Sequence, residues 1–144
     1  MTVLDAYALT AFLGDEASAD EVESLLRARD CHISALNLAE SYDRLIRLQR
    51  LTRAEVDAGV DLLVRTGRLG ILAVDDHLAR RTGELRARTY HRTRRPVSLA
   101  DCVAAATAEL LDDVIATADG HLAAMAREIG VEVIALPDST GKRP

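Results

Sequence analysis

The sequence predicts an α/β fold: a three-layer α/β/α sandwich around a parallel sheet of four to five strands. Short apolar segments with no alternating polar residues, such as residues 31–33 and 114–117, are separated by stretches with helical periodicity. Strands that are buried on both faces carry such apolar runs, and helical connections between strands produce parallel pairing. With 144 residues and 49% hydrophobic content, the chain has enough material for one core.

Each element is expected from local signals. The strands are predicted at residues 2–4, 31–33, 69–74, 114–117 and 131–135. Ser18, Ser34 and Ser98 are typical N-caps, and they precede helical patterns at 19–29, 35–50 and 99–111. The remaining helices are expected at 6–13, between Thr52 and Gly67, from Asp75 into a basic stretch before Pro96, and at 119–129. These elements form one domain, residues 1–136, followed by a flexible tail at 137–144.

Composition narrows the function classes. The formal net charge of -5 and the pI near 5.3 argue against a surface that binds polyanions everywhere. Four aromatic residues are too few for a platform that stacks successive bases. Cys31 and Cys102 lack metal or redox spacing and are expected to be buried and reduced. The chain shows no apolar run of membrane-spanning length and no secretory leader, so a cytoplasmic location is expected.

Four acidic residues are candidates for a shared site. Asp5 and Asp119 follow predicted strands, whereas Glu40 and Asp101 lie in the first or second turn of predicted helices. In an open parallel sheet, ligands bind in the crevice beyond the carboxyl ends of the strands, where these acids would converge. Carboxylates packed together repel each other unless a cation joins them. Mg²⁺ prefers oxygen ligands and bridges to phosphate, so we expect Mg²⁺, with Mn²⁺ as a substitute, rather than zinc.

The segments around these acids resemble a known family. Residues 3–9, 34–40, 99–106 and 116–119 are similar, in order and spacing, to the four acidic motifs of PIN-domain proteins, and most closely to VapC-type toxins of bacterial toxin–antitoxin pairs. The resemblance covers residues 2–135. It implies a PIN-like nuclease domain that acts as a magnesium-dependent endoribonuclease, forms a homodimer and is neutralised by a small antitoxin protein.

The resemblance also implies roles for individual residues. Asp5, Glu40, Asp101 and Asp119 would be the catalytic acids that hold metal, and Thr117 a hydroxyl that orients the site. Two departures from the family pattern are Tyr7, where a Ser or Thr is frequent, and His121-Leu122, where an aromatic residue often follows the last acid. The Tyr7 departure affects a hydrogen bond that family members make beside the metal ligands. The His121-Leu122 departure concerns the surroundings of Asp119, which is therefore the ligand that the resemblance supports least.

Each acid also has a purely structural interpretation. Asp5 and Asp119 suit helix N-caps, and Glu40 could be an ordinary exposed helical glutamate. Asp101 completes an S-x-x-D capping box with Ser98. We interpret Asp75 and Asp76, which also follow a strand, as helix caps without a catalytic role.

The stretch from residue 86 to 95 holds five arginines and no acid. Such a local basic patch could hold RNA phosphates or an acidic antitoxin segment. The alternative is a solvated helix end whose arginines favour the negative pole of the helix dipole. The candidate contact residues are Arg86, Arg88, Tyr90, Arg92, Arg94 and Arg95.

Other function classes lack their motifs. The chain has no G-x-S-x-G, no P-loop and no G-x-G-x-x-G after a strand, and its only lysine, Lys142, lies in the tail, far from where a phospho-receiver needs one. The prediction is therefore a magnesium-dependent endoribonuclease toxin with RNA as substrate. The alternatives are a non-catalytic PIN-like module that holds a protein or RNA partner, and a DNA-cutting nuclease of the same fold. Metal-dependent cleavage would distinguish the predicted ribonuclease from the non-catalytic module. The acidic pI argues against the DNA-cutting nuclease, which would need a broader basic surface.

Overall fold

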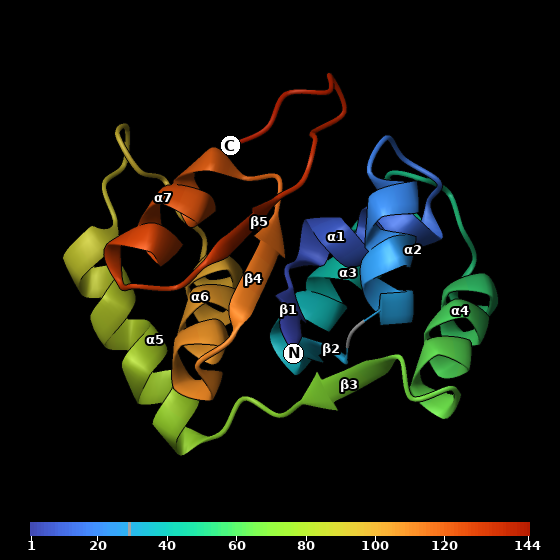
Figure 1. Ribbon diagram of the computed structural model, residues 1–144, viewed down its shortest axis with the longest axis horizontal. Coiled ribbons are helices and arrows are strands. Elements are labelled where there is room, and N and C mark those ends of the chain that lie inside the picture. Colours follow the sequence, from blue (N-terminus) through green and yellow to red (C-terminus); the bar gives the residue numbers. More distant parts are fainter. Residues whose placement is uncertain (29) are drawn as a thin grey trace.

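The computed structural model describes residues 1–28 and 30–144. A five-stranded parallel sheet has the order β3-β2-β1-β4-β5, which confirms the predicted α/β class (Figure 1). The strands are β1 (Thr2–Leu4), β2 (Cys31–Ser34), β3 (Leu69–Leu72), β4 (Val114–Thr117) and β5 (Val133–Ala135). The helices are α1 (Ala6–Leu13), α2 (Ala19–Ala28), α3 (Ala35–Arg47), α4 (Arg53–Arg65), α5 (Asp76–Thr89), α6 (Leu99–Leu111) and α7 (Gly120–Glu128).

The sheet separates two apolar cores. Helices α1 to α4 lie on one side and α5 to α7 on the other, so that the strands are covered on both faces (Figure 1). Consecutive residues of a strand point to opposite faces: Val3 joins the core under α5 to α7, and Leu4 joins the core under α1 to α4. This double burial explains why the strands read as continuous apolar runs.

Side-chain caps fix where the helices begin. Ser34 and Ser98 accept hydrogen bonds from the backbone N–H groups of Asn37 and Asp101, as their positions predicted. Thr52 and Glu55 form a reciprocal capping box at the start of α4. Asp75 accepts from the Leu78 N–H at 2.8 Å, so the interpretation of Asp75 as a helix cap is confirmed.

Several element ends differ from the sequence prediction. Helix α3 ends at Arg47 rather than at residue 50, and Arg50 takes a positive φ of 63°. The strand predicted to reach residue 74 ends at Leu72. Arg29, the predicted last residue of the second helix, lies outside the described residues. Within the described part of the chain, no helix has the length and apolarity needed to cross a bilayer.

The basic stretch is only partly helical. Helix α5 ends at Thr89, and Tyr90 has extended backbone angles. His91 and Arg95 then pair through two backbone hydrogen bonds of 3.0 Å, and the His91 Nδ1 accepts from the backbone N–H groups of Thr93 and Arg94. The imidazole thus closes a tight turn, which ends the helix well before Pro96.

Candidate functional site

The four predicted acids line one pocket at the carboxyl end of the sheet. Asp5 follows β1, Asp119 follows β4, Glu40 lies in the second turn of α3, and Asp101 lies in the first turn of α6. The pocket has a volume of about 160 Å³. Its lining residues are Asp5, Ala6, Tyr7, Glu40, Arg44, Asp101, Ala118, Asp119 and Asp138. The fold therefore brings together side chains that are distant in sequence.

Asp5 is the most deeply placed of these acids, with only 4% of its surface exposed. Burial is the main cause that raises the pKa of Asp5 to about 7, and the charges of Asp101 and Asp119 raise it further. Hydrogen bonds from the Thr117 hydroxyl and from the Ala8 backbone act in the opposite direction. A carboxylate held this way binds a proton or a cation readily at neutral pH.

Thr117 connects two of the acids. Its hydroxyl oxygen, which is fully buried, accepts from the Asp119 backbone N–H at 2.9 Å. A side-chain hydrogen bond with the same hydroxyl lowers the pKa of Asp5, because an ionised carboxylate can only accept and the hydroxyl therefore donates to it. Thr117 thus orients Asp5 and fixes the start of α7, which places it where the sequence predicted an orienting hydroxyl.

Asp5, Asp101 and Asp119 each cap a helix as well as line the pocket. Asp5 accepts from the Ala8 N–H at 2.8 Å, and Asp119 accepts from the N–H groups of His121 and Leu122. Asp101 accepts from the Ser98 N–H at 2.6 Å in the expected capping box. The cap of each side chain uses a single carboxylate oxygen, so capping a helix does not prevent the same side chain from lining the pocket.

Two buried polar residues on α3 set the position of Glu40. The Asn37 side-chain amide donates to the Ala100 carbonyl at 3.1 Å, which ties α3 to the start of α6. The Ser41 hydroxyl lies 3.1 Å from the Ala6 carbonyl, which ties α3 to α1. Glu40 lies between these contacts in sequence. Sequence reasoning missed both residues, although buried polar side chains next to a candidate acid are a usable signal.

Glu40 faces charges of both signs. Burial raises the pKa of Glu40 above its usual range, and the Asp101 carboxylate adds to this effect. Arg44, one helical turn later, acts in the opposite direction; its guanidinium lies 3.8 Å from the Glu40 carboxylate. Arg44 lines the pocket, although its place in the sequence did not indicate this: its spacing of four residues from an acid places it beside Glu40 but does not show that it reaches the pocket.

The donor set fits a hard divalent cation. It consists of carboxylate oxygens, with no His or Cys among the lining residues. Within residues 1–28 and 30–144, no three His, Cys, Asp or Glu side chains are grouped closely enough to hold a metal ion in the conformation described. Carboxylate oxygens are the type of ligand that Mg²⁺ prefers, whereas zinc sites usually include His or Cys, so the identity of the cation stays a prediction that rests on the type of ligand alone.

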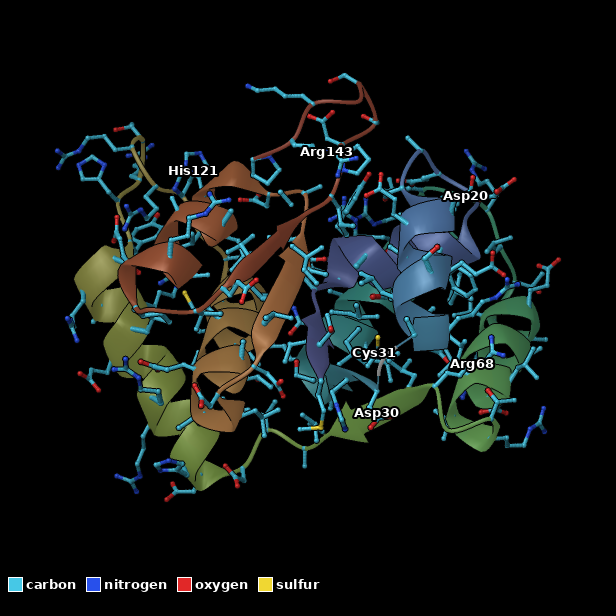
Figure 2. All side chains as sticks on the ribbon, in the orientation of Figure 1. Asp20, Asp30, Cys31, Arg68, His121 and Arg143 are labelled. Atoms are coloured by element: carbon cyan, nitrogen blue, oxygen red, sulfur yellow. The ribbon has the colours of Figure 1, made fainter. Side chains whose placement is uncertain are left out.

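The C-terminal residues, predicted as a flexible tail, make defined contacts beside the pocket. The Tyr7 hydroxyl donates to the Pro137 carbonyl at 3.0 Å, and Asp138 lines the pocket. Arg143, in the tail itself, forms an ion pair with Glu21 on α2 at 2.6 Å, and Figure 2 shows it at the same end of the molecule as His121. Tyr7, a departure from the family pattern, thus holds the tail instead of an acid.

The arginines of the basic stretch at residues 86–95 are not among the residues that line the acidic pocket. Arg86 lies over the Tyr90 ring at 4.2 Å from its centroid. Arg88 pairs with Glu84 at 3.5 Å, and Arg95 pairs with Glu128. Arg92 and Arg94 are exposed in the turn after α5, and neither forms an ion pair with another described residue. Contact of this stretch with RNA or an antitoxin stays a prediction, for which Arg92 and Arg94 are exposed candidates.

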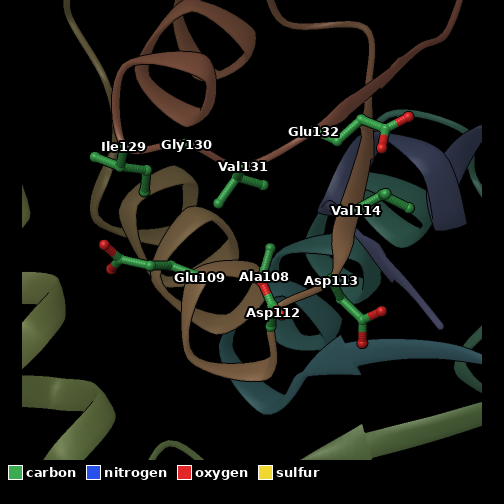
Figure 3. Close-up of a pocket in the computed structure, with 9 residues that line it drawn as sticks. All are labelled: Ala108, Glu109, Asp112, Asp113, Val114, Ile129, Gly130, Val131 and Glu132. Atoms are coloured by element: carbon green, nitrogen blue, oxygen red, sulfur yellow. The ribbon is translucent and has the colours of Figure 1, made fainter.

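A second pocket, of about 260 Å³, lies at the opposite end of the sheet (Figure 3). It includes Val114, the first residue of β4, and Glu132, which precedes β5. None of the four predicted acids lines it. Two acids that do are engaged elsewhere: Glu109 pairs with Arg81, and Asp113 pairs with the Met1 amino group. The amino ends of parallel strands are also the wrong end for ligand binding in this fold class.

Comparison with known proteins identifies the family. The PIN domain model matches residues 2–128. Similar solved structures include Mycobacterium tuberculosis VapC20, described as a sarcin-ricin loop cleaving toxin (TM-score 0.70, 18% identity, 86% of this chain and 94% of that chain covered). A toxin–antitoxin complex from Klebsiella pneumoniae gives a TM-score of 0.65 at 18% identity, covering 93% of this chain and 96% of that chain. Neisseria gonorrhoeae FitAcB gives 0.61 at 23%, with 93% and 96% covered.

No curated protein matches the chain in sequence. The solved structures share the sheet and its flanking helices at identities that establish the fold alone. The family match, in contrast, spans all four acidic segments and most of the chain. This protein belongs to the PIN domain family.

Proposed function

We propose that this protein is a magnesium-dependent endoribonuclease that acts as the toxin of a toxin–antitoxin pair. The observation that carries the proposal is the convergence of Asp5, Glu40, Asp101 and Asp119 on one pocket at the carboxyl end of the sheet. Membership in the PIN domain family and the toxin structures among its structural neighbours support the same function.

The chain's own residues supply binding and orientation. Asp5, fixed by Thr117 and by the Ala8 N–H, presents its carboxylate to the pocket, and Asp101 and Glu40 face it from the neighbouring helices. A bound Mg²⁺ would polarise the phosphodiester and lower the pKa of a water. With a pKa near 7, Asp5 would lose its proton when the cation binds. The positive charge of the cation would then compensate the repulsion among the acids.

The partners follow from the same comparisons. Structural neighbours include toxin–antitoxin complexes from Klebsiella pneumoniae and Rickettsia felis, so we propose a small antitoxin protein as the partner that restrains this chain. The tail beside the pocket and the exposed Arg92 and Arg94 are surfaces that an acidic antitoxin segment could contact. A homodimer is part of the same proposal.

Cleavage of total cellular RNA by the purified protein tests the function. We expect discrete cuts with MgCl₂ and none with a chelator, because the carboxylates alone hold no Lewis acid. An Asp5→Asn sample prepared identically controls for contaminating nuclease. If a folded, partner-free sample cuts no more than this control, the chain is a non-catalytic PIN-like binding module instead.

Magnesium is also expected to stabilise the fold. A cation that binds only the native state at a hundred times its Kd adds about 2.7 kcal/mol to the free energy of unfolding. The thermal midpoint of the native protein should therefore rise with MgCl₂, and that of Asp5→Asn should rise much less. Equal rises in both proteins would place the cation elsewhere on the molecule.

A further inference from the structure

Among the described residues, Arg44 is the one cationic side chain that lines the acidic pocket, beside five carboxylate side chains. An RNA strand that enters this pocket meets strong negative charge from Asp5, Glu40, Asp101, Asp119 and Asp138. The overall charge of the protein does not compensate for this, because the chain as a whole is acidic. A cationic side chain at the pocket would therefore add to the attraction that the proposed Mg²⁺ exerts on a phosphate group.

Arg44 forms a long ion pair with Glu40, which leaves the hydrogen-bond donors of its guanidinium available to a ligand. Its distance of 3.8 Å to Glu40 is too long for a hydrogen bond, and it donates no side-chain hydrogen bond to another residue in the described part of the chain. Only 38% of its side chain is exposed. The guanidinium thus combines partial burial at the pocket with unused donors, which is the arrangement that favours bidentate phosphate binding.

Arg47, on the same helix, shows what an ordinary surface arginine does here. It forms hydrogen bonds with Asp43 through both Nε and Nη2, the shortest at 2.6 Å, and 61% of its side chain is exposed. Arg47 does not line the pocket. Both arginines have an acid four residues earlier, so sequence spacing alone does not separate them; the geometry does.

We propose that Arg44 binds a phosphate group of the RNA strand at the pocket and positions the strand against the acids. This inference rests on the proposed function, because it assumes that RNA occupies the pocket. Arg44 acts by charge and by its forked donors, in contrast to the carboxylates, which act on the cation. Its removal should therefore weaken RNA binding even where no cutting takes place.

The test measures RNA affinity apart from cleavage. Arg44→Ala, Arg44→Lys and Arg47→Ala are each made in the Asp5→Asn background, and a fluorescein-labelled single-stranded RNA of about 12 nucleotides is the probe. Fluorescence anisotropy gives the Kd at several KCl concentrations. We expect Arg44→Ala to weaken binding about tenfold and to reduce the slope of log affinity against log salt by about 0.7, the loss of one phosphate contact.

The two other variants complete the design. Arg44→Lys should keep the salt slope because it keeps the charge, while losing affinity because lysine lacks the fork. Arg47→Ala should match its parent. The inference is overturned if Arg44→Ala behaves like Arg47→Ala, or if the Asp5→Asn parent binds no RNA. Failure of the proposed function appears separately, as an absence of magnesium-dependent cuts by the native chain.

Discussion

Asp5→Asn is expected to abolish activity and to stabilise the protein. RNA cleavage should fall on the order of 100-fold or more, because one preorganised charge at the reacting centre is lost. In the metal-free protein near pH 8, the free energy of unfolding should rise by up to about 4 kcal/mol, since the native fold no longer has to hold a buried anion. Thermal or urea unfolding with chelator present measures this gain.

The pH dependence of this gain identifies its cause. The native pKa of Asp5, about 7, lies above its usual value of 3.8, so the native state holds more protons than the unfolded chain between these values. Stability of the native protein should therefore fall as pH rises from about 4 to 7, and Asp5→Asn should remove that fall. Asp75→Asn is the matched control, because Asp75 makes the same type of cap at an exposed site. A gain that persists unchanged at pH 4 would contradict the electrostatic explanation.

Thr117→Val is expected to destabilise the fold by about 1–3 kcal/mol, because it leaves the Asp119 backbone N–H without its acceptor and removes one of the two hydrogen-bond donors to Asp5. Valine has nearly the shape of threonine, so the effect isolates the hydroxyl. Urea unfolding gives the stability, and the magnesium-dependent cleavage rate should also fall. The pKa of Asp5 should rise further, which moves the pH–activity profile to higher pH.

Thr117→Ser separates the hydroxyl from packing. Serine keeps both hydrogen bonds and loses one buried methyl group, at a cost of about 1 kcal/mol. Its pH–activity profile should coincide with that of the native protein. If Thr117→Val and Thr117→Ser show the same pH profile, the hydroxyl does not orient the acids.

The sequence predicted the fold and the four acids because both leave local signals. Apolar runs on doubly covered strands mark the sheet, and acids directly after strands or near helix starts mark its carboxyl end. The cap interpretation of Asp101 was correct, and so was the expectation that it faces the other acids. Asp101 can both cap α6 and line the pocket, because the N-terminus of α6 points at the pocket and its capping acid lies there too.

The remaining parts of the site depend on tertiary contacts. Asp138 reaches the pocket because Tyr7 and Glu21 hold the tail. Both contacts join residues that are far apart in sequence, so no local sequence pattern predicts them. The early end of α5 depends on the His91 imidazole, which accepts two backbone N–H groups across a turn. The sequence predicted a helix that runs through the basic stretch toward Pro96. The backbone instead forms a turn in which the His91 side chain accepts hydrogen bonds, and α5 ends before this turn.

The position of β1 in the middle of the sheet has a consequence for synthesis of the chain. Leu4 of β1 pairs with Ala116 of β4, so the strand that leads into Asp5 acquires one of its two neighbours only after most of the polypeptide has been made. Asp101 and Asp119 also arrive late, whereas Asp5 and Glu40 emerge early. A growing chain with an unfinished sheet therefore has no assembled acidic pocket, and all four acids can come together only late in synthesis.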